Sequence, residues 1–198
     1  MCFMGTLTGY QVSAARAVFD SVLEDRGLVF TIESEAPFGS RQLSAHLETL
    51  LLGLHAQRGA RLLKIAPTDE ALGRTQLAEV LNAATPEGFW EMDRGVVRLG
   101  RAEVLYTTPH SAECVPGTIG LVEVAEAHLM SPFAIANAVA TARSNQATTV
   151  LYGTCRREDS AFGQWVLQNQ ELQTHMSSQL HFSIGLNREP IQATRTLR

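Results

Sequence analysis

Lysine is almost missing from this chain: Lys64 is the only lysine among its 16 lysine and arginine residues. A site that needs a compact point charge must therefore use Lys64 or work with the planar guanidinium of arginine. Cysteine is also scarce, because Cys2, Cys114 and Cys155 are odd in number and have no metal-ligand spacing. This usage excludes a disulfide scaffold and indicates reduced thiols in a cytoplasmic protein.

Long apolar runs and an excess of positive charge are missing as well. No apolar run is long enough to span a bilayer, so we expect no membrane partner. The net charge of −4 gives no general electrostatic signal for nucleic acid. Hydrophobic residues make up 45% of the chain and charged residues 18%, as in a folded globular protein rather than a disordered one. We expect a single domain over residues 1–198, with residues 190–198 as a loose tail.

What the sequence does contain is an alternation of short apolar runs and amphipathic stretches. The runs predict strands at residues 28–32, 61–66, 118–124, 148–152 and 180–184. The stretches predict helices at about residues 11–24, 41–57, 68–84, 132–143 and 160–173. Alternation of this kind predicts an α/β protein with a mainly parallel sheet, covered on both faces as a three-layer α/β/α sandwich.

Two further features refine this architecture. The segments 96–99 and 102–106 flank Gly100-Arg101, which predicts a β-hairpin inserted into the fold. In the predicted helix at residues 41–57, five leucines recur at helical spacing and are expected to face the core. These leucines are Leu43, Leu47, Leu50, Leu51 and Leu54.

The stretch from Thr118 to His128 is the centre of the functional interpretation. It is an apolar strand that ends in Ala125-Glu126-Ala127-His128. Open α/β sheets present their chemistry at the carboxyl ends of strands, so Glu126 and His128 are the candidate catalytic residues. An ordinary buried strand with a polar end is the alternative for this segment taken alone.

A second candidate segment runs from Ser34 to Arg41, between the first predicted strand and the next predicted helix. Backbone N–H groups and the helix dipole face an anion at such a junction. Gly39, Ser40 and Arg41 are therefore candidate nucleotide-binding residues. The alternative for this segment alone is a plain strand-to-helix loop.

Taken together, these motifs resemble the ATPase domain of the phage terminase large subunit and, more distantly, the first RecA-like lobe of helicases. The resemblance spans roughly residues 9–164 and also rests on Gln11, on Ala66-Pro67-Thr68 and on Thr154 after a strand. It implies a P-loop NTPase-like domain with ATP and Mg²⁺ as ligands. It also implies double-stranded DNA or a phage packaging or assembly protein as partner. A nuclease domain is expected to be absent.

The same resemblance implies a role for each site residue. Gln11 would read adenine, Gly39-Ser40-Arg41 would hold the phosphates, and Glu126 would activate water. Thr154 would couple hydrolysis to movement. Since all three segments follow apolar strands, we expect the loops at Gly39, Glu126 and Thr154 to lie side by side.

Three departures from the terminase pattern decide the functional hypothesis. Ser40 stands where the motif has its lysine, Arg41 where it has a hydroxyl, and Ala125 where it has the magnesium-binding aspartate. Phosphoryl transfer depends on such positioning and charge, so ATP and Mg²⁺ binding is expected to be weak or lost. We expect a degenerate ATPase fold that acts as a nucleotide- or DNA-binding or assembly module in a phage-related DNA process.

Two alternatives stay open at this point. One is an active ATPase that uses Arg41, Glu123 and Glu126 as atypical ligands, since Glu123 shares a strand face with Ala125. The other is a scaffold that never meets a nucleotide. No residue is assigned as a metal ligand.

Overall fold

The computed structural model describes most of the chain in nine segments. These are residues 7, 9–34, 37–57, 59–71, 91–93, 95–112, 118–154, 160–172 and 179–184. The strands among them are β1 (Val29–Ser34), β2 (Arg61–Ile65), β3 (Glu91–Asp93), β4 (Val96–Leu99), β5 (Ala102–Thr107), β6 (Leu121–Val124), β7 (Thr148–Gly153) and β8 (Gln179–Ile184). The helices are α1 (Gly9–Leu23), α2 (Pro37–His55), α5 (Pro109–Ala112), the 3-10 turn η1 (Ala127–Leu129), α6 (Pro132–Ser144) and α7 (Ala161–Leu172).

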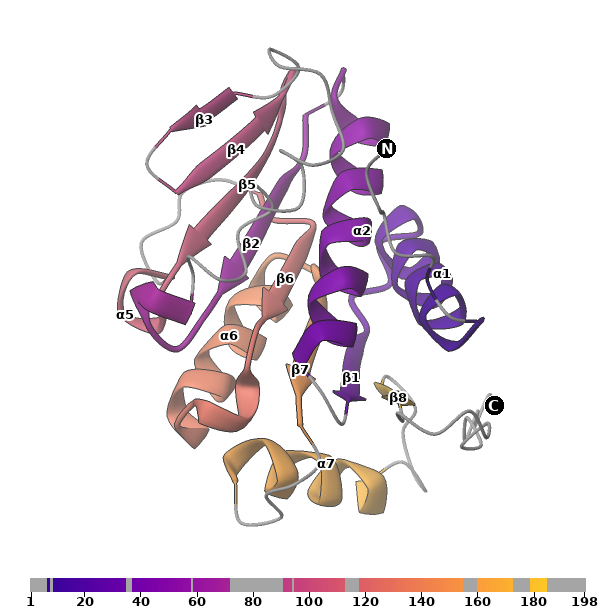
Figure 1. Cartoon of the computed structure of the whole chain (residues 1–198), viewed down its shortest axis with the longest axis vertical. Helices are drawn as coiled ribbons and strands as arrows, with labels where there is room; N and C mark the ends of the chain where they lie inside the picture. Colours follow the sequence, from indigo (N-terminus) through magenta and orange to yellow (C-terminus); the bar gives the residue numbers. More distant parts are fainter. Residues whose placement is uncertain are drawn as a thin grey trace.

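All of these strands join one sheet, in the order β3-β4-β5-β2-β6-β7-β1-β8. From β5 to β8 every pairing is parallel, whereas at the other edge β4 pairs antiparallel with both β5 and β3. The predicted mainly parallel α/β sheet is therefore confirmed (Figure 1). The predicted hairpin is present as β4 and β5, but its second strand belongs to the main parallel sheet.

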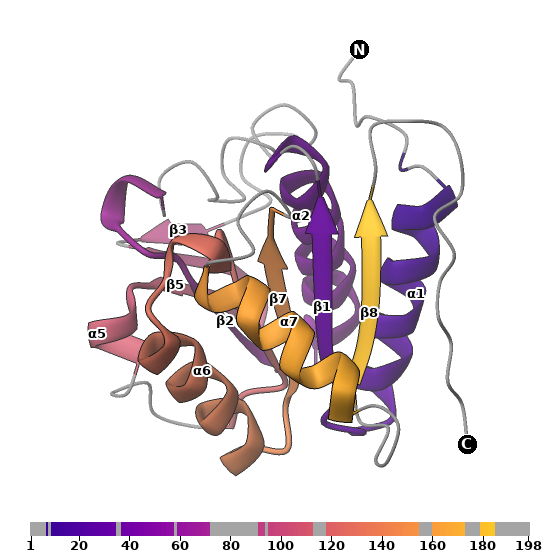
Figure 2. The same ribbon diagram turned by 90° about the horizontal axis from the view of Figure 1, so that it is seen from below.

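Helices cover both faces of the sheet, as the predicted three-layer sandwich requires (Figure 2). One apolar core joins α1 and α2 to one face, and it contains Val18, Leu47 and Leu121. The other joins α6 and α7 to the opposite face through residues such as Ile135 and Phe162. Within the described residues, every helix is too short or too polar to cross a bilayer.

The beginning of α2 differs from the prediction. The sequence pattern placed a loop up to Ser40 and the first helical residue at Arg41, but α2 begins at Pro37. Proline suits the first turn of a helix because its missing N–H has no intrahelical partner there. As a result, Gly39 and Ser40 lie in the first turn of the helix rather than in a loop.

Other predicted elements are present with small shifts. Thr68 caps a helical turn as expected, because the backbone N–H of Ala71 donates to its Oγ1 at 3.1 Å. The remainder of that predicted helix lies outside the described residues, as do Cys2, Cys114, Cys155 and the expected loose tail at residues 190–198. Leu50 and Leu54, predicted to face the core, are 42% and 49% exposed.

Gly153, the last residue of β7, gives a test of how tightly α7 packs on the sheet. A Cβ atom at Gly153 would overlap the ring of Phe162, which is completely buried. We expect Gly153→Ala to lower the free energy of unfolding by about 1–3 kcal/mol, the usual cost of overpacking. Urea unfolding of the full chain measures this effect.

Gly53 provides the matched control for that substitution. It lies on the exposed side of α2, and a Cβ there would have no atom within 4 Å. Gly53→Ala is expected to raise the free energy of unfolding by about 0.5–1 kcal/mol, because alanine favours the helix. Equal effects of the two substitutions would contradict the packing of Phe162 on the end of β7.

Candidate functional site

The candidate site lies where β6, β7 and β1 end. These three parallel strands are neighbours, and α2 follows β1 at the same edge. This is the lower edge of the sheet in Figure 1. The first turn of α2 with Gly39, the residue Glu126 after β6 and the residue Thr154 after β7 are thus grouped at one edge, as predicted.

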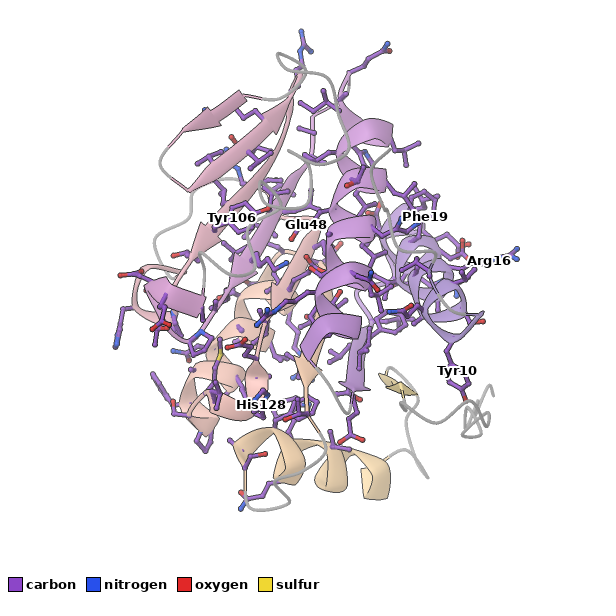
Figure 3. All side chains as sticks on the ribbon, viewed as in Figure 1. Tyr10, Arg16, Phe19, Glu48, Tyr106 and His128 are labelled. Carbon is purple, nitrogen blue, oxygen red and sulfur yellow. The ribbon has the colours of Figure 1, made fainter. Side chains whose placement is uncertain are left out.

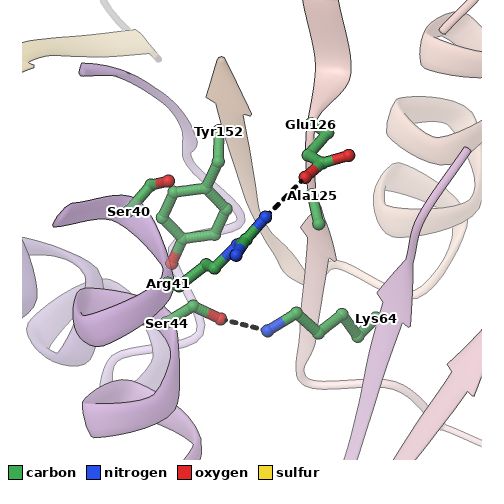
Figure 4. A pocket seen from close by; sticks show the side chains of 7 residues that line it. All are labelled: Ser40, Arg41, Ser44, Lys64, Ala125, Glu126 and Tyr152. Carbon is green, nitrogen blue, oxygen red and sulfur yellow. Dashed lines mark hydrogen bonds and ion pairs between the residues drawn. The ribbon is translucent and has the colours of Figure 1, made fainter. Parts of the chain in front are cut away.

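An ion pair connects two of these segments. The Nη2 atom of Arg41 on α2 donates to Oε1 of Glu126 at 3.0 Å (Figure 4). The side chain of Arg41 is 34% exposed and that of Glu126 only 11% exposed. Ala125 lies beside this pair and carries no group that binds a cation.

The backbone of Glu126 is held in an unusual conformation. Its φ and ψ angles of 49° and 41° are left-handed, which is rare for a residue other than glycine. The turn that follows stabilises it, because the N–H of Leu129 donates to the Glu126 carbonyl at 2.8 Å. Strained residues of this kind gather at functional sites, so the conformation supports a role for Glu126.

Further from the carboxyl edge than the ion pair, a row of polar side chains crosses the face of the sheet that α2 covers. Tyr106 on β5 and Glu123 on β6 are the direct neighbours of Lys64 on β2. From α2, Ser44 and Glu48 project onto this row, and Figure 3 shows Glu48 beside Tyr106. We call the set of Lys64, Glu123, Tyr106, Ser44 and Glu48, together with Tyr152 of β7, the buried polar cluster.

Hydrogen bonds connect every member of this cluster. Lys64 Nζ donates to Glu48 Oε1 at 2.8 Å and to Ser44 Oγ at 2.5 Å. Tyr106 donates to the other oxygen of Glu48 at 2.8 Å. Glu123 accepts from Ser44 at 3.0 Å and from Tyr152 at 2.5 Å. The Lys64 side chain is only 2% exposed, so these bonds replace the water that its charge has lost.

The electrostatics of the cluster follow from burial. Burial raises the pKa of Glu123 from 4.5 to about 8, although the nearby Lys64 ammonium acts in the opposite direction. Burial alone would lower the pKa of Lys64, but the charges of Glu48 and Glu123 outweigh it and raise that pKa. Burial and the neighbouring Glu123 also raise the pKa of Tyr152. Burial thus favours the protonated form of Glu123, whereas Lys64 Nζ forms its short ion pair with Glu48, at 2.8 Å.

Between the ion pair and the buried polar cluster lies a small cavity of about 20 Å³. It is lined by Ser40, Arg41, Ser44, Lys64, Ala125, Glu126 and Tyr152. That volume suffices for about one water molecule. A phosphoryl group would therefore need some of these side chains to move.

These residues do not fit a magnesium ion. Mg²⁺ prefers carboxylate and hydroxyl oxygens in octahedral geometry, but Ala125 offers none and Arg41 brings a positive charge. Glu126 is engaged by Arg41, and Glu123 is bonded to Ser44 and Tyr152. No group of three or more His, Cys, Asp or Glu side chains suited to a metal occurs among the described residues.

The remaining predicted site residues lie outside the cavity. Gln11 is buried near the start of α1, and the neighbouring Tyr10 projects outward from the lower end of that helix (Figure 3). His128 is half-buried in η1, and Thr154 is half-buried just after β7. None of the three is among the residues that line the cavity. Their proposed roles in adenine reading, catalysis and coupling stay predictions.

The sequence interpretation missed most of the buried polar cluster. Lys64 was noted only as the single lysine, and Glu123 only as a substitute acid. One signal was available: Ser44 and Glu48 are four residues apart and interrupt a leucine-rich helical face. Polar residues on one helix face beside leucines indicate a buried polar contact, and Lys64 within an apolar strand indicates its partner.

Two solved structures of phage large terminases are similar to this chain. The large terminase of a thermophilic bacteriophage is 11% identical, with a TM-score of 0.64 over 90% of this chain and 45% of the terminase. The HK97 bacteriophage large terminase is 13% identical, with a TM-score of 0.60 over 94% of this chain and 41% of the terminase. No protein-family model matches the sequence, and no curated protein sequence matches it.

At this level of identity the likeness concerns the fold. This chain spans less than half the length of each terminase structure. The strand order, the helices on both faces and the position of the site at the carboxyl edge agree with the RecA-like architecture predicted from the sequence. Over the matched part of those structures, the chain has the fold of the phage large terminases.

Proposed function

We propose that this protein is a terminase-like ATPase-fold protein that has lost magnesium-dependent ATP hydrolysis. It acts as a nucleotide- or DNA-binding or assembly module in a phage-related DNA process. The observation that carries this proposal is the Arg41–Glu126 ion pair beside Ala125. It puts a guanidinium where the terminase pattern has a magnesium-binding hydroxyl, and it occupies the carboxylate that would polarise water.

The geometry also argues against the alternative of an active ATPase with atypical ligands. That alternative needs Glu123 as a metal ligand in place of the acid missing at Ala125. Glu123 is only 1% exposed, it accepts hydrogen bonds from Ser44 and Tyr152, and burial raises its pKa, which favours the protonated form. A protonated, buried carboxyl group is a poor ligand for a hard cation.

The first experiment measures ATP turnover by the full chain in excess Mg²⁺. We expect no phosphate release above the rate without protein, because no described group is placed to hold the metal against the phosphates. Glu126→Gln is the control, and it should leave this result unchanged. Turnover of about 1 per second or faster that Glu126→Gln abolishes would establish the active alternative.

A calorimetric titration with ATP then separates the two inactive alternatives. A degenerate nucleotide-binding module gives measurable heat of binding without turnover. A scaffold that never meets a nucleotide gives none, and double-stranded DNA or a packaging protein then becomes the ligand to test. The likeness to phage large terminases supports these two ligands.

A further inference from the structure

The guanidinium of Arg41 is only partly used in the ion pair. Nη2 donates to Glu126, whereas Nε is buried and has no acceptor among the described residues. Arginine presents Nε and Nη2 in one plane, a fork that suits two oxygens of one anion. The single contact with Glu126 at 3.0 Å thus leaves a buried donor that a bidentate anion would satisfy.

The surroundings of this guanidinium favour an anion. Besides Arg41, the residues that line the cavity include Ser40, Ser44 and Lys64, whose side chains carry hydroxyl and ammonium groups. The first turn of α2, which contains Ser40, leaves backbone N–H groups without intrahelical partners and carries the positive end of the helix dipole. Glu126 is the one carboxylate among the residues lining the cavity, and Lys64, the second cation there, is paired with Glu48 behind it.

We propose that a phosphoryl oxyanion exchanges with the Glu126 carboxylate on Arg41, so that this site binds phosphoryl groups without a divalent cation. The ligand class is a small molecule with a terminal phosphate or diphosphate. The inference rests on the proposed function, since a site that turned over magnesium-bound ATP would need Glu126 and a metal for chemistry.

In this site the positive charge of Arg41 replaces the charge that a metal ion supplies in magnesium-dependent phosphate sites. Arginine carries its positive charge on a planar guanidinium, whose donors match the oxygens of a phosphate. It projects from α2 toward the end of β6, where Ala125 leaves room for it (Figure 4). A divalent cation at this place would meet the repulsion of Arg41 and would find no acid at position 125.

Glu126 is then an internal competitor for the anion. Its carboxylate neutralises Arg41 while the site is empty, and its left-handed backbone, with φ at 49°, directs the side chain back toward α2. Because the side chain is 11% exposed, the site must open for an anion to enter. Removing the negative charge of Glu126 should therefore help an anion rather than hinder it.

The test is isothermal titration calorimetry of the full chain with sodium pyrophosphate in EDTA, repeated in excess Mg²⁺. The wild-type chain is expected to bind pyrophosphate in EDTA, and Mg²⁺ should not tighten the binding. Glu126→Gln should bind about tenfold tighter, since it removes the competing charge and keeps the shape. Arg41→Gln should bind at least tenfold more weakly than the wild-type chain.

Arg61 offers a matched control for Arg41. Arg61 Nε donates to Glu103 at 2.6 Å in a second part-buried ion pair, which is not part of the cavity lining. Arg61→Gln should leave the affinity for pyrophosphate unchanged. Circular dichroism of each variant shows that it is folded before it is titrated.

Three results would overturn the inference. They are the absence of heat from folded Glu126→Gln in EDTA, binding that requires Mg²⁺, and equal affinities of Arg41→Gln and the wild-type chain. ATP turnover would instead overturn the proposed function, so the two failures are distinguishable. A parallel titration with ATP identifies the source of the phosphoryl group: tighter binding than pyrophosphate indicates a nucleotide, and equal binding a plain diphosphate.

Discussion

Lys64→Met is expected to lower the free energy of unfolding by about 3–5 kcal/mol, the usual cost of breaking a buried ion pair on one side. Lys64 Nζ lies 2.8 Å from Glu48 and 4.0 Å from Glu123, and all three side chains are almost fully buried. Methionine fills a similar volume but leaves the Glu48 carboxylate without its cation. Urea unfolding of the full chain at neutral pH measures the loss.

Two further variants isolate the charge effect in that experiment. Lys64→Met combined with Glu48→Gln removes both charges and should recover more than half of the loss, because no uncompensated ion is left in the interior. Arg16→Met breaks an exposed ion pair with Asp20 on α1 and should produce no measurable change. If Lys64→Met were as harmless as Arg16→Met, Lys64 would not be buried between β2 and α2.

The buried polar cluster also shows why the inward face of α2 was predicted only in part: Leu43, Leu47 and Leu51 are completely buried as expected, but two other leucines are not. The apolar pattern took Leu50 and Leu54 as core residues, yet they are 42% and 49% exposed, whereas Leu52 is completely buried. At about 100° per residue, the buried arc of α2 is centred near Ser44 and Glu48. A pattern that counts only apolar residues rotates the helix away from its polar contacts with the sheet.

Most strands and helices were predicted because their signals are local. An apolar run or a helical period is visible within a few residues, and even the last strand, β8, was found in this way. The short β3 was missed because Glu91-Met92-Asp93 contains one apolar residue. Glu126 was predicted to be a residue of the site because it follows an apolar strand, which is likewise a local feature.

For the site, the sequence predicted which residues follow the strands but not which side chains contact one another, because these contacts join segments that are distant in the sequence. The register that sets Tyr106 and Glu123 on either side of Lys64 joins three strands that are distant in the sequence. Likewise, the pairing of Arg41 with Glu126 depends on α2 beginning at Pro37, which turns Arg41 toward the end of β6. Neither fact is present in any local pattern.

The protonation of Glu123 makes the stability contributed by the buried polar cluster depend on pH. Burial raises the pKa of its carboxyl group from 4.5 to about 8, so the folded chain holds a proton there that the unfolded chain has already released. Between these two values the folded state binds more protons than the unfolded state. Stability contributed by this group is therefore present at low pH and is lost as the pH rises toward 8.

Glu123→Gln should remove this loss. Glutamine resembles the protonated acid in shape and keeps partners for Ser44 and Tyr152, but it does not titrate. Relative to the wild-type chain, we expect the free energy of unfolding of Glu123→Gln to rise between pH 5 and pH 8, by at most about 1.4 kcal/mol per pH unit. Urea unfolding of both proteins at pH 5, 6, 7 and 8 gives this difference directly.

Val124→Ala, one residue further along β6, is the control for that series. It removes buried apolar volume and no titrating group, so it should lower the free energy of unfolding by the same amount at every pH. A difference between Glu123→Gln and the wild-type chain that stays constant from pH 5 to pH 8 would mean that Glu123 is ionised in the folded chain over that range. Glu123 would then be an available acid beside Ala125, which would favour an active ATPase.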